Sequence, residues 1–239
     1  SLGKNITVPV VVRELAVQGQ PLLLQIHDFP EDGRSENYHF LVDNLADGNE
    51  EALGSTLYPI ASHVHYAVLN PRDARFLEQS GVPDGQRHLL PNPVSLDMPD
   101  QSSCREKPAN NGRLILYPTR AIRRKNVGEF LLWAALNGED GDRYAVTLAP
   151  RNPRARPVYE RWVETELGAR SELSFPELLG NATFAMSTSV GEGFGLAFLE
   201  PWLAGCPLLG RKLPELTQGF EEAGVELSHL YERLLVPLA

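Results

Sequence analysis

The sequence is poor in the features that would assign it to a class of protein directly. Only two of its 239 residues are cysteines, Cys104 and Cys206, and they lie too far apart for a metal-binding motif. No apolar run approaches the roughly 18 residues that a membrane-spanning helix needs, and the first residues show no signal-peptide pattern. We therefore expect a cytoplasmic protein with reduced thiols and no transmembrane segment, either free or peripheral at the inner face of the membrane.

Positive charge is also scarce. Lysine and arginine number 22 against 31 acidic residues, which gives a net charge of −9. This balance argues against nucleic acid as a partner. The hydrophobic fraction of 42% and the charged fraction of 22% are ordinary for a soluble globular protein, and the length allows one or two domains.

The hydrophobic pattern predicts an α/β fold made of two Rossmann-like, doubly wound domains. We expect a first domain over residues 1–96, a polar linker over 97–112 and a second domain over 113–239. Two expected helices follow each other without a strand between Leu167 and Phe175, so a strand is missing there. The expected helices are 5–18, 37–45, 71–81, 127–136, 158–167 and 175–179; the expected strands are 21–27, 63–69, 87–90, 113–117, 144–148 and 184–188.

A glycine turn after the last of these strands carries the strongest functional signal. It runs from Ser189 to Pro201, holds Gly-Phe-Gly between Glu192 and Glu200, and the pattern becomes helical after Gly195. A strand, a glycine turn and a helix start present outward N–H groups that bind anions. Because carboxylates repel phosphate, the two glutamates should meet hydroxyl groups instead. A nucleotide sugar has both phosphates and hydroxyls.

A basic segment forms a second anion site. Arg120, Arg123, Arg124 and Lys125 put four cations into six residues of an acidic chain, just before a helix that we expect to start near Val127. Asn126 and Glu129 have the spacing of a capping box. Cations before a helix start oppose its dipole unless an anion binds there. We assign Arg120 and Lys125 to the anion and interpret Arg123 and Arg124 as a solvated turn.

Topology brings these two segments together. In the common strand order of a doubly wound sheet, the strand ending at Tyr117 and the strand ending at Thr188 are neighbours at the switch point, where ligands bind beyond the strand ends. The basic segment and the glycine turn should therefore line one crevice. Neither motif alone would decide this, because short glycine-rich turns are common.

These residues resemble the carboxyl-terminal half of a retaining glycosyltransferase of the GT-B fold, close to glycosyltransferase family 4. The resemblance rests on the Glu-x7-Glu motif at Glu192 and Glu200, on the Arg-x4-Lys pair at Arg120 and Lys125, and on the turn at 204–207. It implies transfer of a sugar from a nucleoside-diphosphate sugar to an acceptor hydroxyl, the acceptor being a saccharide, a lipid-linked molecule or a small molecule.

The resemblance also implies roles for the site residues. Arg120 and Lys125 would neutralise the diphosphate, Glu192 would hold hydroxyls of the donor sugar, and Glu200 would hold the ribose diol. The catalytic set is then Arg120, Lys125, Glu192 and His27, and the donor-binding set is Gly193, Phe194, Gly195, Leu196 and Glu200. No cofactor or metal is expected, because cations and amides would stabilise the leaving diphosphate.

The first hundred residues resemble the end of the family's amino-terminal domain, with 24–28 similar to a strand-end histidine segment. The family's early glycine-rich loop and its closing helix have no counterpart, so we expect this domain to be incomplete. His27 could bind the sugar or acceptor, or could equally cap a loop. His63 and His65 could form a metal pair, but a structural role is favoured. Two alternatives stay open: a non-catalytic nucleotide-sugar-binding module, and a phosphorylase or epimerase of the same fold.

Overall fold

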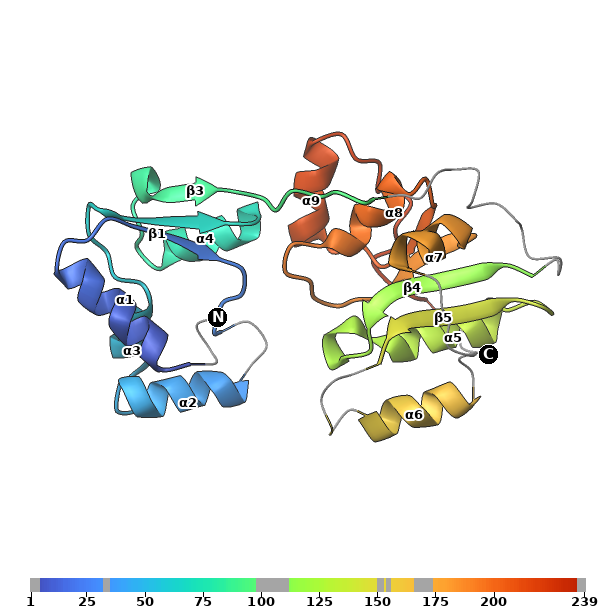
Figure 1. Ribbon diagram of the computed structural model, residues 1–239, viewed down its shortest axis with the longest axis horizontal. Helices are drawn as coiled ribbons and strands as arrows, with labels where there is room; N and C mark the ends of the chain where they lie inside the picture. Colours follow the sequence, from blue (N-terminus) through green and yellow to red (C-terminus); the bar gives the residue numbers. More distant parts are fainter. Residues whose placement is uncertain are drawn as a thin grey trace. The chain divides into compact units, whose positions relative to one another are not determined.

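The computed structural model describes residues 5–31, 35–97, 112–149, 153, 156–165 and 174–235. The chain folds as two compact units, Ser1–Asn92 and Pro93–Ala239, which are drawn in Figure 1. Residues 98–111 of the predicted linker lie outside the described residues, and so does 166–173, the stretch in which a strand was predicted to be missing.

The first unit is a three-stranded parallel sheet with helices. Its strand order is β1-β2-β3, and the expected helices and strands of this half are confirmed. A helix over Glu50–Leu57 was not predicted, because it is short and holds Gly54, Ser55 and Thr56, which are weak helix formers. The elements are α1 (Thr7–Val17), β1 (Leu22–Ile26), α2 (Ser35–Leu45), α3 (Glu50–Leu57), β2 (Val64–Val68), α4 (Pro71–Gln79), the 3-10 turn η2 (Asp84–Gln86) and β3 (Arg87–Leu89).

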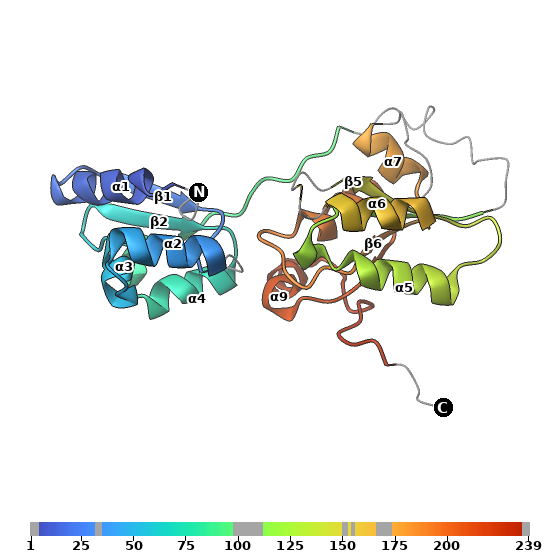
Figure 2. The same cartoon turned by 90° about the horizontal axis from the view of Figure 1, so that it is seen from below.

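The core of the first unit lies on one face of this sheet. Val64, Tyr66 and Val68 alternate along β2 and pack into one cluster with residues of all four helices. The other face carries His65 beside Leu23, whose side chain is 63% exposed. Figure 2 shows α2, α3 and α4 together on one side of the strands.

The second unit is a four-stranded parallel sheet with the order β5-β4-β6-β7. The expected strand neighbours, now β4 and β6, are therefore adjacent, and the prediction is confirmed. The elements are β4 (Leu114–Arg120), η3 (Arg123–Lys125), α5 (Val127–Asn137), β5 (Arg143–Leu148), α6 (Arg156–Thr165), α7 (Phe175–Asn181), β6 (Phe184–Ser187), η4 (Leu196–Phe198), α8 (Glu200–Leu203), β7 (Leu208–Gly210) and α9 (Pro214–Glu222).

Helices cover both faces of this second sheet. Leu116 of β4 and Ala185 of β6 pack with α7, η4 and α9, whereas Ile115 and Tyr117 pack with α5 and with Tyr159 of α6. The two clusters follow from the alternation of side chains along each strand. Both units are thus α/β with parallel sheets, and the predicted fold class is confirmed. None of the described helices combines the length and apolar character needed to cross a membrane.

Two local predictions were wrong. Asn126 does not form a capping box, because it adopts a left-handed backbone (φ 49°) and its amide donates to the Glu129 carboxylate instead of accepting from the helix. The helix expected after Gly195 is divided into the three-residue 3-10 turn η4 and the four-residue α8. The chain turns after α8 at Gly205, which has a left-handed backbone (φ +63°).

Candidate functional site

The candidate site lies in the second unit, beyond the carboxyl ends of β4 and β6. The segment after β4 contains η3, and the segment after β6 contains the glycine turn. Pro118 cannot donate a backbone hydrogen bond, and the pairing of β4 with β5 is irregular between Tyr117 and Arg120. This irregularity at the strand end precedes the basic segment.

Backbone and side-chain hydrogen bonds join the two segments. The N–H of Val190 donates to the carbonyl of Arg124 at 2.9 Å, and the hydroxyl of Thr188 donates to the carbonyl of Asn126 at 3.0 Å. From below, the hydroxyl of Tyr117 donates to the carbonyl of Lys125 at 2.7 Å. The path of the basic segment is therefore fixed by the end of the neighbouring strand.

Lys125 and Glu192 form an ion pair across the two segments. The side chains are only 13% and 7% exposed, so both charges are largely removed from water. Burial lowers the pKa of Lys125 below its ordinary value, although the charge of Glu192 opposes this shift. The pair brings together two of the predicted catalytic residues. In this structure the carboxylate of Glu192 is bound to the ammonium group of Lys125.

Arg120 ends β4 and is the third predicted charged residue of the site. Its Nε is buried without a hydrogen-bond partner among the described residues. A buried donor without an acceptor is uncommon in proteins and calls for an explanation, such as a bound ligand. The side chains of Arg123 and Arg124 are exposed, as expected for a solvated turn.

The glycine turn is shaped by packing as well as by its exposed backbone. Gly195 has φ +91°, and a Cβ atom there would lie 2.4 Å from Leu216 of α9. Phe194 is buried and meets Phe220 edge to face, with 5.7 Å between the ring centroids. Leu196 is 39% exposed, and Gly193 is partly buried. The left-handed backbone and the packing of α9 thus both favour glycine here, whether or not a ligand binds.

Glu200 is the first residue of α8 and is partly buried. Burial raises its pKa above the ordinary value. No hydrogen bond or ion pair to its carboxylate is found among the residues that the structure describes. The second glutamate of the motif therefore differs from Glu192, which has Lys125 as its partner.

His27 belongs to the other unit. It is exposed and follows β1, so it lies at the carboxyl end of a strand as predicted. The structure places His27 within the first unit, and the remaining predicted site residues within the second.

The histidine and acidic residues that the structure describes were compared with the needs of a metal site. Among the described residues, no group of three or more histidine, cysteine or acidic side chains could hold a metal ion. The Nε2–H of His63 donates to the carbonyl of Ala16, and His65 contacts His88. Asp140 and Asp142 have the Asp-x-Asp spacing, but Asp142 pairs with Arg113 before β5, at the amino ends of the strands. That pair therefore lies away from the candidate site.

A polar network supports the basic segment from the side of α5. Glu129 accepts hydrogen bonds from Asn126 at 2.7 Å, Arg211 at 2.6 Å and Tyr231 at 2.6 Å. Trp133 donates to the hydroxyl of Tyr231 at 3.0 Å. The network ties the residue after Lys125 to the segment that follows β7 and to the chain near residue 231.

Several contacts of the site were not predicted from the sequence. Tyr117, Thr188 and Ser189 hold the two segments together, and Glu129 anchors Asn126. One signal was available: the apolar strand β6 ends in the polar run 187–189, whose members are all buried. Buried hydroxyls at a strand end need acceptors, and the neighbouring segment supplies them for Thr188 and Ser189, whereas the hydroxyl of Ser187 has none among the described residues.

Comparison with known families finds no family model that matches the chain. At the level of sequence, the chain is 33% identical to mannosylglucosyl-3-phosphoglycerate synthase of Petrotoga mobilis over an alignment 267 residues long. The match covers the whole of this chain and 50% of that protein. The chain therefore spans about half the length of this curated relative.

Several solved structures are similar to the chain. Sucrose-phosphate synthase of Thermosynechococcus elongatus has a TM-score of 0.62 at 17% identity, covering 87% of this chain and 54% of that one. WaaG, a glycosyltransferase of lipopolysaccharide biosynthesis, has 0.60 at 14% identity, covering 89% and 65%. Anabaena HepE in complex with UDP and glucose has 0.59 at 17% identity, covering 87% and 57%. The two Rossmann-like units of this chain therefore have the GT-B fold.

Proposed function

We propose that this chain is part of a retaining glycosyltransferase, close to glycosyltransferase family 4. It would bind a nucleoside-diphosphate sugar in the second unit and transfer the sugar to an acceptor hydroxyl. The observation that carries the proposal is the joining of the basic segment to the glycine turn, with Lys125, Arg120 and Glu192 at one end of the sheet. The similarity to WaaG and to a Petrotoga synthase supports it.

The diphosphate is the proposed ligand of Lys125 and Arg120. The buried Nε of Arg120 needs an acceptor, and phosphate oxygens match a guanidinium well. Lys125 is desolvated, so a phosphate would restore the charge stabilisation that burial removes. A diphosphate would also compete with Glu192 for the ammonium group of Lys125. Glu192 would then be available to accept hydrogen bonds from sugar hydroxyls.

Glu200 is the proposed partner of the ribose. Its carboxylate belongs to the first residue of α8, five residues after Gly195 in the glycine turn. Because its pKa is raised by burial, a ligand that donates two hydroxyl hydrogen bonds would stabilise the charged form. The amides of Gly195 and Leu196 are the proposed supplementary donors to the diphosphate, with Gly193 and Phe194 shaping the turn.

The proposed reaction breaks the bond between the anomeric carbon and the diphosphate oxygen. The acceptor oxygen attacks the same face of the sugar, and its proton passes to the departing diphosphate. Negative charge grows on that diphosphate in the transition state, where fixed cations give the largest stabilisation. Arg120 and Lys125 supply such cations, so no divalent metal is required in this scheme. His27 is the proposed contact to the sugar or the acceptor from the first unit.

The first test is a product assay with the intact protein. Nucleotide sugars are supplied with candidate hydroxyl acceptors, UDP-glucose first because HepE was solved in complex with it. We expect release of the nucleoside diphosphate only when an acceptor is present. The anomeric configuration of the product, measured by NMR, should be the same as that of the donor. Inverted configuration would contradict retention. Tight donor binding without any transfer would make the protein a non-catalytic nucleotide-sugar-binding module.

The second test addresses the site residues by calorimetry with the nucleoside diphosphate. Lys125→Ala and Glu200→Gln should each lower the affinity about tenfold or more, because each removes a charged hydrogen-bonding partner. Lys212→Ala is the matched control, since Lys212 pairs with Glu221 at 2.9 Å elsewhere in the same unit. Unchanged affinity in both site variants would refute the assignment. Full activity in the presence of a chelator is expected, and its loss would contradict the metal-independent scheme.

A further inference from the structure

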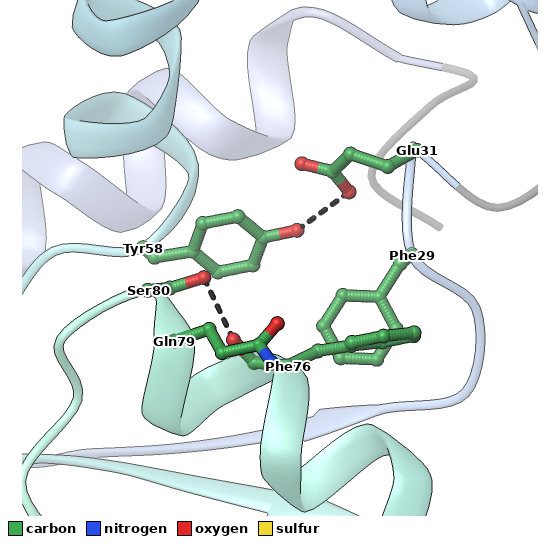
Figure 3. Close-up of a pocket in the computed structure, with 6 residues that line it drawn as sticks. All are labelled: Phe29, Glu31, Tyr58, Phe76, Gln79 and Ser80. Atoms are coloured by element: carbon green, nitrogen blue, oxygen red, sulfur yellow. Dashed lines mark hydrogen bonds between the residues drawn. The ribbon is translucent and has the colours of Figure 1, made fainter.

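A cavity in the first unit is lined by residues to which the proposed glycosyl transfer gives no role. Its volume is about 310 Å³, at the lower end of the range for small-molecule sites. Figure 3 shows its six lining side chains, which come from the segment after β1, from the end of α3 and from α4. The lining residues are Phe29, Glu31, Tyr58, Phe76, Gln79 and Ser80.

Three aromatic rings form the apolar part of the cavity. Phe29 meets Phe76 edge to face at 5.8 Å between centroids, and it lies 6.2 Å from Tyr58. Phe29 and Tyr58 are buried in the core, so the rings are held in place. The guanidinium of Arg72 already lies over the ring of Phe76, at 5.3 Å from its centroid. The cluster therefore attracts cations, as aromatic faces do.

The polar groups of the cavity present lone pairs, because their hydrogens are already used. The hydroxyl of Tyr58 donates to the carboxylate of Glu31 at 2.9 Å, and the hydroxyl of Ser80 donates to the carbonyl of Phe76 at 2.9 Å. Burial and the charge of Glu31 raise the pKa of Tyr58, so its hydroxyl keeps the proton and remains the donor. Of the six described lining residues, Gln79 alone still offers N–H donors.

Glu31 gives the cavity a negative charge. The structure shows no ion pair to its carboxylate among the residues that it describes. The nearby Arg72 is paired with Asp73 at 3.0 Å. A carboxylate with one neutral donor, beside three aromatic faces, is matched by a group that is positively charged and donates hydrogen bonds.

We propose that this cavity binds a small organic cation with a primary ammonium group. The ammonium would donate to Glu31 and to the hydroxyl oxygen of Tyr58, while its carbon body packs on Phe29 and Phe76. A neutral alcohol fits less well, since it offers a single donor and no charge. An anion is opposed by Glu31. The inference uses only residues of the first unit and does not depend on the proposed glycosyl transfer.

The test compares two probes of the same shape, cyclohexylammonium and cyclohexanol, by titration followed in amide NMR spectra of the full chain. We expect saturable shifts at Phe29, Tyr58 and Phe76 with cyclohexylammonium, and at least a tenfold weaker response with cyclohexanol. Equal affinities for the two probes, or no saturable shift with either, would overturn the proposal.

Substitutions can separate the contribution of the Glu31 charge to binding from that of the aromatic rings. Glu31→Gln should weaken cyclohexylammonium binding about tenfold or more, whereas Asp43→Asn, which removes the same charge from an exposed position of α2, should change it less than about twofold. Phe76→Leu keeps an apolar wall without an aromatic face, and should cost about two- to fivefold. Unchanged binding in Glu31→Gln with intact spectra would overturn the proposal, and so would equal losses in Glu31→Gln and Asp43→Asn.

Discussion

The turn after β2 in the first unit and the turn after β6 in the second unit bury polar residues in different ways. After β2, Asn70 accepts from the N–H of Asp73 and donates to its carboxylate, both at 2.9 Å. These bonds close within four residues and cap α4. After β6, the hydroxyls of Thr188 and Ser189 reach across to carbonyls of the basic segment, more than 60 residues away in the chain.

The difference separates a structural turn from a candidate binding turn. In the first unit the buried Asn70 and Asp73 satisfy each other, so nothing remains for a ligand. In the second unit the hydroxyls only hold the backbone, while the buried Nε of Arg120 stays without a partner in the described part of the chain. The unsatisfied Nε of Arg120, together with the desolvated Lys125, therefore points to a ligand more strongly than burial alone does.

The largest effect is expected where the second turn packs on α9. Gly195→Ala should destabilise the second unit by about 2–4 kcal/mol, from a left-handed backbone and from overpacking. Gly191→Ala is the control, since no atom lies within 4 Å of a Cβ there. Urea unfolding followed by tryptophan fluorescence measures this unit, because all three tryptophans (133, 162 and 202) lie in it. Equal losses in the two variants would show that neither the left-handed backbone nor the packing on α9 matters at Gly195.

Substitutions in the turn after β2 of the first unit should lower stability without changing the affinity for the nucleotide. Asn70→Ala is expected to cost about 1–3 kcal/mol, because it removes a buried cap and one partner of Asp73. Hydrogen exchange at the amides of α4 measures the loss. Asn49→Ala removes the exposed cap of α3 and should cost less. Affinity for UDP should stay the same in both variants, and a change would contradict the division of roles between the units.

Two buried threonines can be compared, because one donates its hydroxyl hydrogen bond to the basic segment and the other donates within its own helix. Thr188 and Thr217 are both fully buried, but Thr217 donates to the carbonyl of Leu213, four residues before it in the sequence. Thr188→Val and Thr217→Val should each cost about 1 kcal/mol of stability. Only Thr188→Val should also weaken UDP binding severalfold, as measured by calorimetry. Similar affinities in the two variants would remove Thr188 from the support of the site.

The smallest effect concerns the pH dependence of stability. The pKa of Lys125 in the folded chain is lowered from the ordinary 10.5, so the unfolded chain binds more protons between the two values. This lysine therefore disfavours folding at lower pH, and the penalty is lost as pH rises towards 10.5. Wild type should gain stability relative to Lys125→Met over this alkaline range in urea unfolding. A constant difference would mean that Lys125 is not desolvated.

The sequence predicted those elements whose local pattern and long-range packing agree. The strands β4 and β6 are apolar and end in marked turns, so their adjacency followed from the rule for doubly wound sheets. The same pattern located Arg120, Lys125 and the glycine turn at the ends of these strands. The helix α3 was missed because its sequence is weakly helical and the tertiary core stabilises it.

Contacts between distant residues could not be predicted. Lys125 and Glu192 are 67 positions apart, and no spacing in the sequence indicates that they pair. Asn126 and Glu129 match a capping box in sequence, yet Glu129 is held by Arg211 and Tyr231, and Asn126 takes another conformation. No sequence pattern predicts the cavity lined by Phe29, Tyr58 and Phe76 either, since its residues come from three separate segments.

Tyr231 sets a limit on how far the chain can be shortened from its end. Its N–H donates to Gly210, its carbonyl accepts from Lys212, and its hydroxyl reaches Glu129. A protease cut or a stop codon before Tyr231 would remove one donor from the carboxylate that anchors Asn126. Such a shortened protein would lose part of the support of the Lys125 segment even though every residue of both motifs is still present.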